Sequence, residues 1–266
     1  MIILLSCENK SNTNNDKAPT TTNEQYEKKT TSEEPKKNPN TEQPEKNPDS
    51  NKENHGNTEK QTENSSPKST LIDAPLISQL PELKNGCEIT SLAMMLNYAG
   101  IEVDKMTLAK KVEKDTTPPT YDKNGNIIEW GDPDEGFVGD ITGDEPGYSV
   151  DPEPLLGLIN QYLPNKAMDL TGVSYDEIEK TLSNKIPIVV WVTCDFKNPS
   201  KNTQWNSDGE TVNATFSQHA VLLTGYDADN IYYNDPHSNT KNKKVSKANF
   251  IRIWQTMGKK ALSYRK

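Results

Sequence analysis

The chain has 266 residues and a formal net charge of −9, from 30 basic and 39 acidic side chains. This acidic balance, without a block of basic residues, argues against DNA, RNA or an anionic lipid surface as the main partner. With only three cysteines and three histidines in the chain, each position of these residues bears on the chemistry.

The first seven residues, MIILLSC, match a bacterial lipobox, because Leu4 stands at position −3 and Ser6 at position −1 relative to Cys7. Diacylation of Cys7 would hold the chain at a membrane, since two acyl chains anchor far more stably than one. Residues 1–7 are therefore predicted to be a remnant or truncated lipoprotein signal, with the rest of its apolar stretch upstream. The alternative is an arbitrary N-terminal sequence.

A polar segment separates this motif from the rest of the chain. Residues 8–70 contain no Leu, Ile, Val, Met, Phe, Trp or Cys. Such a segment has no apolar surface whose burial offsets the entropy of ordering it, so we predict a disordered linker. Residues 71–266 are long enough for one domain with a sizeable core. No run within them approaches the roughly 18 apolar residues that span a bilayer.

The domain is predicted to begin with an extended entry segment over residues 71–83, in which two prolines limit regular strand pairing. A helix is predicted from Cys87, because apolar residues recur at helical spacing as far as Ala99 and Gly100 suits a C-cap. Residues 106–114 form a second, shorter helical pattern.

Turns and helices follow in the middle of the domain. Asn124 and Gly125 between extended segments predict a hairpin. Residues 132–151 are acidic and rich in Gly and Pro, which indicates a long loop. This loop either borders a cleft and selects basic or amine-bearing substrates, or is simply solvated. Helices are expected at 153–163 and 174–184, the second with Ser and Glu spaced as in a capping box.

The last third of the domain is rich in strand patterns. Apolar and β-branched runs predict strands at 186–194, 219–227 and 230–236. A last helix is predicted at 246–258. Helices early in the domain and antiparallel-looking strands later indicate an α+β fold.

Two of these strands predict a histidine–carboxylate pair. His219 opens the strand 219–227, and Asp235 ends the next one, sixteen residues later. If the two strands pair as a hairpin, the start of the first lies beside the end of the second, and Asp235 orients the imidazole. Of the other histidines, His237 reads as a turn residue and His55 belongs to the linker.

Cys87 is the candidate nucleophile. Unpaired N–H groups and the positive end of the helix dipole favour a thiolate at a helix start, and an adjacent imidazolium favours it further. Thiolate, imidazole and an orienting group are what cysteine nucleophilic catalysis requires. The Cys87 backbone N–H and the side-chain amide of Gln79 are candidate oxyanion donors. The alternatives are that Cys87 is a small core residue, as Cys194 is expected to be, or that the two form a disulfide.

The segments NGCEITSLAMMLNYAG, EGFVGD, HAVLLTGYD and YYNDP resemble the papain-like peptidases of family C39, and more closely the stand-alone peptidase C39-like proteins of bacterial surfaces. The resemblance runs from about Leu71 to Tyr264. It implies a papain-like α+β fold with a helical half and an antiparallel β half. Transporter-linked members, which cut leader peptides after double glycine, carry membrane and ATP-binding domains that are not seen in this sequence, so the substrate does not carry over.

The resemblance also implies roles for individual residues. The helical half would carry Cys87, and the β half His219 and Asp235. The family uses the Asp of the Asp-Pro pair, which selects Asp235 over the neighbouring Asn234. Gln79 is implied as an oxyanion donor, although it stands two residues further upstream than is usual in papain-like enzymes.

These features predict a cysteine peptidase that hydrolyses amides through a thioester. The alternatives are a catalytically idle papain-like module that binds peptide or cell wall, and an acyl or peptidyl transferase that uses the same thioester. The expected substrate is a peptide or a peptidoglycan-like polymer, with no cofactor, metal or nucleic acid. We expect a monomer, attached to the membrane only through Cys7 on the extracellular face of a bacterial cell, or secreted.

Overall fold

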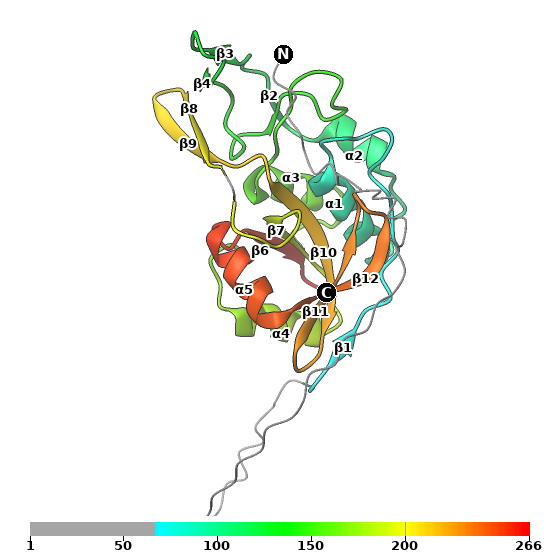
Figure 1. Ribbon diagram of the computed structural model, residues 1–266. Helices are drawn as coiled ribbons and strands as arrows, with labels where there is room; N and C mark the ends of the chain where they lie inside the picture. The colour runs from blue at the N-terminus through cyan, green and yellow to red at the C-terminus, as the bar shows by residue number, and fades with distance from the viewer. Residues whose placement is uncertain (1–66, 200) are drawn as a thin grey trace, which may run out of the picture. The chain divides into compact units, whose positions relative to one another are not determined.

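The structure is a computed structural model that describes residues 67–199 and 201–266 (Figure 1). A seven-stranded antiparallel sheet forms its centre. The strand order is β12-β11-β10-β7-β13-β6, and β1 pairs with β10 beyond this path. The strands of this sheet are β1 (Thr70–Leu71), β6 (Ala167–Asp169), β7 (Ile188–Thr193), β10 (Gln218–Tyr226), β11 (Asn230–Asp235), β12 (Thr240–Ser246) and β13 (Ala261–Tyr264).

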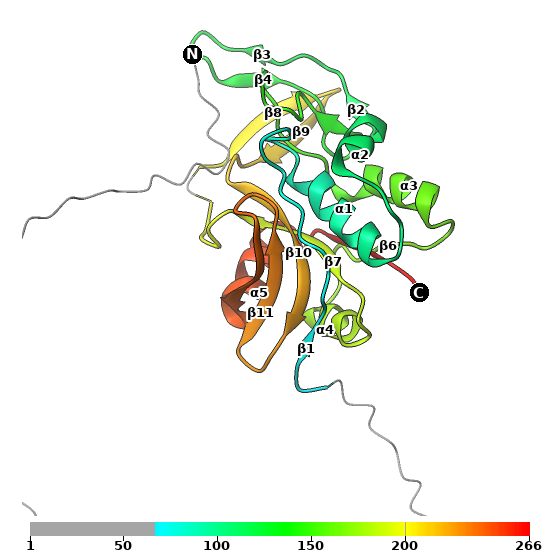
Figure 2. The same ribbon diagram turned by 90° about the vertical axis from the view of Figure 1, so that its right-hand side faces the viewer.

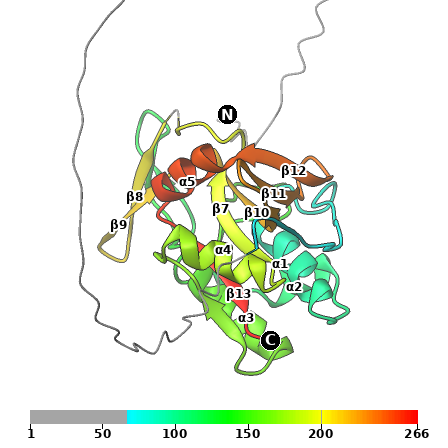
Figure 3. The same ribbon diagram turned by 90° about the horizontal axis from the view of Figure 1, so that it is seen from below.

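Helices cover both faces of this sheet. Helices α1, α3 and α4 lie on one face and α5 on the other (Figures 2 and 3). The described residues form the helices α1 (Cys87–Tyr98), α2 (Lys105–Lys111), α3 (Pro152–Tyr162), α4 (Tyr175–Ser183) and α5 (Lys247–Thr256). None of them is long and apolar enough to cross a membrane.

The centre of the sheet is apolar on both faces because it is covered on both. Every residue of β7, from Ile188 to Thr193, is buried, which explains its continuous apolar sequence. Trp191 on this strand donates its indole N–H to the Val150 carbonyl, 3.1 Å away. Gly225 allows β1 to approach β10, since a Cβ atom there would lie 2.2 Å from the Thr70 carbonyl oxygen.

Two smaller sheets lie outside the central one. A four-stranded sheet has the order β3-β4-β8-β9, and β2 pairs with β5 in parallel. Their strands are β2 (Lys114–Asp115), β3 (Thr120–Tyr121), β4 (Ile127–Glu129), β5 (Phe137–Val138), β8 (Thr203–Ser207) and β9 (Glu210–Ala214). The rings of Trp130, Trp205 and Tyr148 pack together and, with apolar side chains from β4, β5, β8 and β9, form a second, smaller core.

Most predicted elements of the domain are present. All five predicted helices form, and the Asn124–Gly125 hairpin joins β3 to β4. Ser174 caps α4 by accepting the Glu177 backbone N–H at 3.3 Å. The mixed α+β class is confirmed. The predicted signal and most of the predicted linker, residues 1–66, lie outside the described residues.

Candidate active site

Cys87 is the first residue of α1 and carries a free thiol, so it is not joined to Cys194. The preceding Gly86 packs closely on the loop, because a Cβ atom there would lie 2.6 Å from Leu83 Cβ. Thr90 Oγ1 donates to the Gly86 carbonyl at 2.8 Å and steadies the first turn. The helix start is thereby fixed in place, and Cys87 is 8% exposed.

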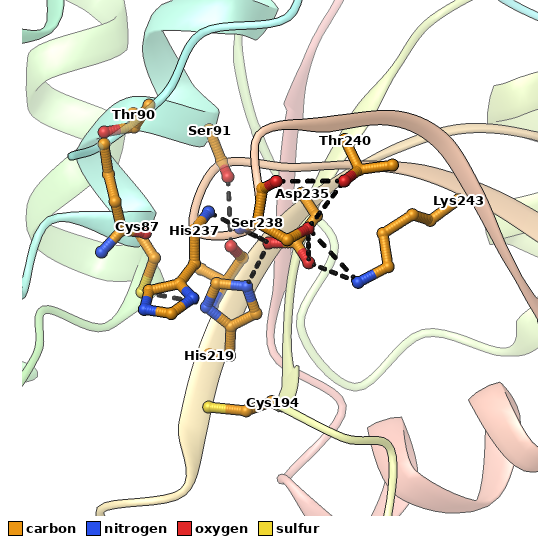
Figure 4. Close-up of polar contacts among 12 residues, drawn as sticks. Cys87, Thr90, Ser91, Cys194, His219, Asp235, His237, Ser238, Thr240 and Lys243 are labelled. Carbon is orange, nitrogen blue, oxygen red and sulfur yellow. Dashed lines mark hydrogen bonds and ion pairs between the residues drawn. The ribbon is translucent and has the colours of Figure 1, made fainter. Parts of the chain in front are cut away.

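Helix α1 rests against β10 at the residue next to His219. The Ala220 backbone N–H donates to Cys87 Sγ at 3.4 Å. Ser91, one turn along α1, donates its hydroxyl to the Ala220 carbonyl at 3.2 Å. These two contacts bring the start of α1 and the start of β10 together, and Figure 4 shows Cys87 and His219 in one cluster.

His219 and Asp235 form the pair that the hairpin argument predicts. Strands β10 and β11 pair antiparallel, and His219 Nε2 lies 2.9 Å from Asp235 Oδ1. A carboxylate only accepts, so Nε2 carries a proton and donates it, which leaves Nδ1 of the neutral ring as an acceptor. In Figure 4 this second nitrogen is turned toward the side on which Cys87 lies.

The Asp235 carboxylate is held by several donors besides His219. Its Oδ1 accepts the His237 backbone N–H at 3.0 Å, and Oδ2 accepts Ser238 Oγ at 2.7 Å and Lys243 Nζ at 2.8 Å. Burial alone would raise the pKa of Asp235. The hydrogen bond from His219, the charge of His219 when its ring is protonated, and the hydrogen bonds from Lys243 and Ser238 outweigh this and hold the pKa well below its usual range. This depressed pKa keeps Asp235 as a carboxylate beside His219 at neutral pH.

Asn234 has a structural role instead. Its Nδ2 donates to the Ala74 and Pro75 carbonyls at 3.3 and 3.1 Å, and its Oδ1 accepts the Asn242 N–H at 3.0 Å. These bonds tie the entry segment to β11 and β12. Of the two candidates for the third residue, the structure brings Asp235 to His219.

His237 belongs to the same cluster, although the sequence indicates only a turn at this position. Its ring centroid lies 6.2 Å from that of His219, at an interplanar angle of 83°. Burial and the charge of His219 both lower its pKa. Figure 4 shows the His237 ring on the same side of the cluster as Cys87. The sequence signal was its place two residues after Asp235.

Gln79 is close to the helix start, but its side-chain amide does not have the orientation that an oxyanion donor would need. Its Nε2 donates to the Leu83 and Lys84 carbonyls at 3.2 and 2.8 Å, so both amide hydrogens are engaged within the loop. The side chain is buried, and its Oε1 has no partner among the described residues. In this structure Gln79 shapes the loop that leads into Cys87.

Replacing Gln79 by Ala is expected to lower the free energy of unfolding by about 1–3 kcal/mol, because one buried and one partly buried carbonyl lose their donor. Urea titrations of the variant and of the wild type measure this difference. Ser78→Ala is the matched control, since the hydroxyl of this neighbouring residue makes only an exposed local contact with Leu80. Equal stability of Gln79→Ala and the wild type would contradict the structural role.

The resting Cys87 does not have the electrostatics that its helix position predicts. Burial raises the pKa of its thiol well above the ordinary value, and the charge of the adjacent Glu88 raises it further. The Ala220 N–H opposes this rise without outweighing it. The direction of this shift is opposite to the one expected for a stabilised thiolate, and it favours the uncharged thiol in the resting site.

Cys194 lies just after β7, near the same end of β10. Its Sγ is 3.9 Å from the Gln218 carbonyl oxygen, and the residue is half-buried. Figure 4 places it on the opposite side of His219 from Asp235. The predicted fully buried core position is thus only partly correct.

In the acidic loop, the carboxylate of Asp140 is engaged by backbone N–H groups of the same loop. Asp140 accepts the N–H groups of Thr142, Asp144 and Glu145 at 2.9 to 3.0 Å. These hydrogen bonds favour the interpretation that the acidic loop is stabilised by its own side chains, and not that it selects a substrate. In residues 67–199 and 201–266, no three or more His, Cys, Asp or Glu side chains are grouped to hold a metal ion.

Similarity to known proteins covers most of the described domain. The model of the Peptidase_C39 like family matches residues 71–262. The uncharacterized protein YvpB of Bacillus subtilis (strain 168) is 39% identical over 197 residues, which are 73% of this chain and 76% of YvpB. A crystal structure from Bacillus anthracis, described as that of a candidate C39-like peptidase, matches with a TM-score of 0.67 and 41% identity, over 75% of this chain and 98% of that one.

Proposed function

This chain belongs to the Peptidase_C39 like family, and from that premise we propose that it is a cysteine peptidase with Cys87 as nucleophile, His219 as general base and acid, and Asp235 as orienting group. One arrangement supports the proposal: His219 is hydrogen-bonded to Asp235, and Ala220, the next residue of β10, donates its backbone N–H to Cys87 Sγ. We further propose a papain-like division, with α1 on one side of the site and β10 and β11 on the other.

The reaction begins with an uncharged thiol. Cys87 Sγ attacks an amide carbonyl carbon while its proton passes to His219 Nδ1. The C–N bond then breaks, the imidazolium gives this proton to the leaving amine, and a thioester remains on Cys87. Water, deprotonated by His219, hydrolyses the thioester and restores the thiol. Asp235 stabilises the imidazolium in both steps.

The developing oxyanion needs hydrogen-bond donors. The N–H groups of the first helical turn have no intrahelical partners, so the backbone N–H at Cys87 suits this role. The side-chain amide of Gln79 would serve as a second donor only by leaving the Leu83 and Lys84 carbonyls. We therefore assign Gln79 to the support of the loop, and the oxyanion to backbone donors at the start of α1.

The test is to incubate the full-length chain with a mixed-sequence peptide library and to identify products by mass spectrometry. We expect shortened peptides with new amino termini. The same reaction with added glycinamide separates hydrolysis from transfer, because a transferase would join the acyl fragment to this amine. An intact library at high enzyme concentration would contradict the peptidase proposal.

A catalytically idle module that binds peptide or cell wall is the second candidate. It is supported by the raised pKa of Cys87 and by the engagement of the Gln79 amide, since both leave the site short of preformed activation. Retention of library peptides on the immobilised chain, without cleavage, is the result that this candidate predicts.

We also propose that a lipid on Cys7 tethers the peptidase to the outer face of a bacterial membrane, where it acts on peptides or peptidoglycan cross-bridges as a monomer. The sequence LLSC and the polar composition of residues 8–70 support this placement. Detergent phase partition of cell extracts tests it: the wild type is expected in the detergent phase and Cys7→Ser in the aqueous phase. The same distribution for both proteins would contradict the anchor.

A further inference from the structure

Glu88 is a buried carboxyl group directly beside the proposed nucleophile. It follows Cys87 in the first turn of α1 and is 1% exposed. Its Oε1 accepts the Ser149 hydroxyl at 2.6 Å, while its Oε2 is buried without a hydrogen-bond partner among the described residues. Burial of a carboxyl oxygen without a partner is costly, so this position calls for a physical explanation.

A short polar chain connects Glu88 to the strand that carries His219. Ser149 Oγ, which donates to Glu88, accepts a hydrogen bond from Gln218 Nε2. Gln218 immediately precedes His219 in β10. Tyr148 donates its hydroxyl to Gln218 Oε1 at 3.4 Å. Glu88 thus joins the first turn of α1 to the first residue of β10, next to both members of the proposed catalytic pair.

The charge of Glu88 acts directly on the thiol. Glu88 directly follows Cys87 in the first turn of α1, and after burial its charge is the largest influence that raises the pKa of Cys87. Burial also raises the pKa of Glu88 itself, to about 7, against the opposing hydrogen bond from Ser149. Above that pH the carboxylate is charged and opposes a second negative charge on sulfur.

The other charged or ionisable groups near Glu88 are few. Asp151 adds a like charge and is paired with Lys260. Asp134 faces Asp151, and the hydroxyl of Tyr148 faces both Glu88 and Asp151. No cation among the described residues forms an ion pair with Glu88 within 4.0 Å. Among the described residues, the charge of Glu88 therefore raises the pKa of Cys87 with no ion-pair partner to offset it.

We propose that Glu88 is a positioning residue of this site: through Ser149 it holds the first turn of α1 against β10, and its carboxylate keeps Cys87 as an uncharged thiol until the proton passes to His219. The part of this proposal that concerns proton transfer to His219 during turnover rests on the proposed peptidase function. The part that concerns the resting thiol does not, because the reactivity of the thiol toward an alkylating agent needs no substrate. A resting thiol is also protected from oxidation, which proceeds through the thiolate.

The test compares Glu88→Gln with the wild type in the full-length chain. Iodoacetamide modification of Cys87 is followed at pH 8 by mass spectrometry of the peptide that contains it. Glutamine keeps the size of the side chain and removes its charge, so we expect alkylation to become about tenfold faster, which corresponds to a drop of roughly one unit in the pKa of Cys87. Glu88→Met, also uncharged, is the second variant if Glu88→Gln does not fold.

Ser149→Ala is the matched control. It breaks the same polar chain but keeps the Glu88 carboxyl group. Because the Ser149 hydrogen bond lowers the pKa of Glu88, the variants and the wild type are also compared at about pH 9.5, where this carboxylate is charged with or without Ser149, and alkylation of Cys87 in Ser149→Ala should there stay within about twofold of the wild type. A purely structural role would make the two variants behave alike. The inference is overturned if Glu88→Gln is alkylated no faster than the wild type, or if Ser149→Ala accelerates the reaction equally.

Stability against pH gives a second readout. Since the folded state raises the pKa of Glu88 from 4.5 to about 7, the folded protein binds this proton more tightly than the unfolded chain does. The free energy of unfolding should therefore fall as pH rises across this window, and Glu88→Gln should lose that part of the fall. A peptidase with unchanged alkylation in Glu88→Gln would refute only this inference, whereas faster alkylation without any peptide cleavage would refute only the proposed function.

Discussion

Replacing Cys87 by Ala is expected to reduce peptide cleavage by about 10⁴-fold or more, because the proposed thioester forms on Cys87 Sγ. The fold should tolerate the change. The side chain is small, and its Sγ accepts one long hydrogen bond from Ala220. Initial rates of product release at saturating peptide measure the loss, and thermal unfolding checks that the variant is folded.

Cys87→Ser sharpens this test. It keeps a nucleophilic atom in nearly the same place, but a hydroxyl gives up its proton far less readily than a thiol. The serine variant should therefore be almost as inactive as the alanine variant, while peptide binding survives in both. If Cys87→Ala retained more than a few per cent of the wild-type rate, the nucleophile would have to be another residue.

The second large effect is expected at Asp235. Replacing it by Asn removes the charge that stabilises the His219 imidazolium and, with its amide oxygen toward His219, puts an NH₂ group where Oδ2 now accepts from both Ser238 and Lys243. We expect the rate of cleavage to fall by about 10²- to 10⁴-fold. Because the peptide itself does not contact Asp235 in the proposed mechanism, the loss should lie mainly in kcat and not in KM.

Asp235→Asn should also change how stability depends on pH. The folded state depresses the pKa of Asp235 from 3.8, so this carboxylate stabilises the fold above that value, and the contribution is lost progressively as pH falls from there toward the depressed pKa. The variant should be less stable than the wild type at neutral pH, and the difference should shrink in acid. Urea unfolding at about pH 7 and about pH 3 measures this.

Asp227→Asn is the matched control for Asp235. Asp227 lies at the other end of the same hairpin and accepts the Tyr232 hydroxyl at 2.7 Å, which lowers its pKa to about 2. Its replacement should affect acid stability but leave the rate of cleavage unchanged. An equal loss of activity in the two variants would mean that Asp235 acts only through the integrity of the hairpin.

The central part of the site follows from sequence because its geometry is local. His219 and Asp235 end up together since antiparallel strands joined by a short turn align the start of one with the end of the other. Cys87 stands at a helix start because the apolar spacing begins there and Gly86 precedes it. These relations depend on periodicity and turn chemistry, which the sequence displays directly.

Other elements depend on pairing across the fold. Strand β12 has the polar sequence TKNKKVS, and it forms because β11 offers it an edge. The short strands β6 and β13 pair with each other and carry too few residues for a pattern. The β8–β9 hairpin could have been predicted from the sequence but was missed. Asp208 and Gly209 are a hairpin signal, and both have positive φ, 47° and 92°.

The electrostatics of the site were the least accessible to sequence. An acidic residue at the second position of a helix, such as Glu88, ordinarily indicates an exposed side chain near the helix dipole. Its burial, like the burial of Cys87 that raises the pKa of the thiol, depends on packing against segments such as Ser149 and β10, which are distant in sequence. The orientation of the Gln79 amide likewise depends on the carbonyls of the loop that it closes.

The most direct test of the account is to look for the acyl group on Cys87. A peptide ester of the best-cleaved library sequence should acylate the enzyme faster than water removes the acyl group. Acid quenching, digestion and mass spectrometry should then find the acyl fragment on the peptide that contains Cys87, in a form that hydroxylamine removes. Cleavage of the ester with no adduct on Cys87, or with the adduct on another residue, would contradict the account.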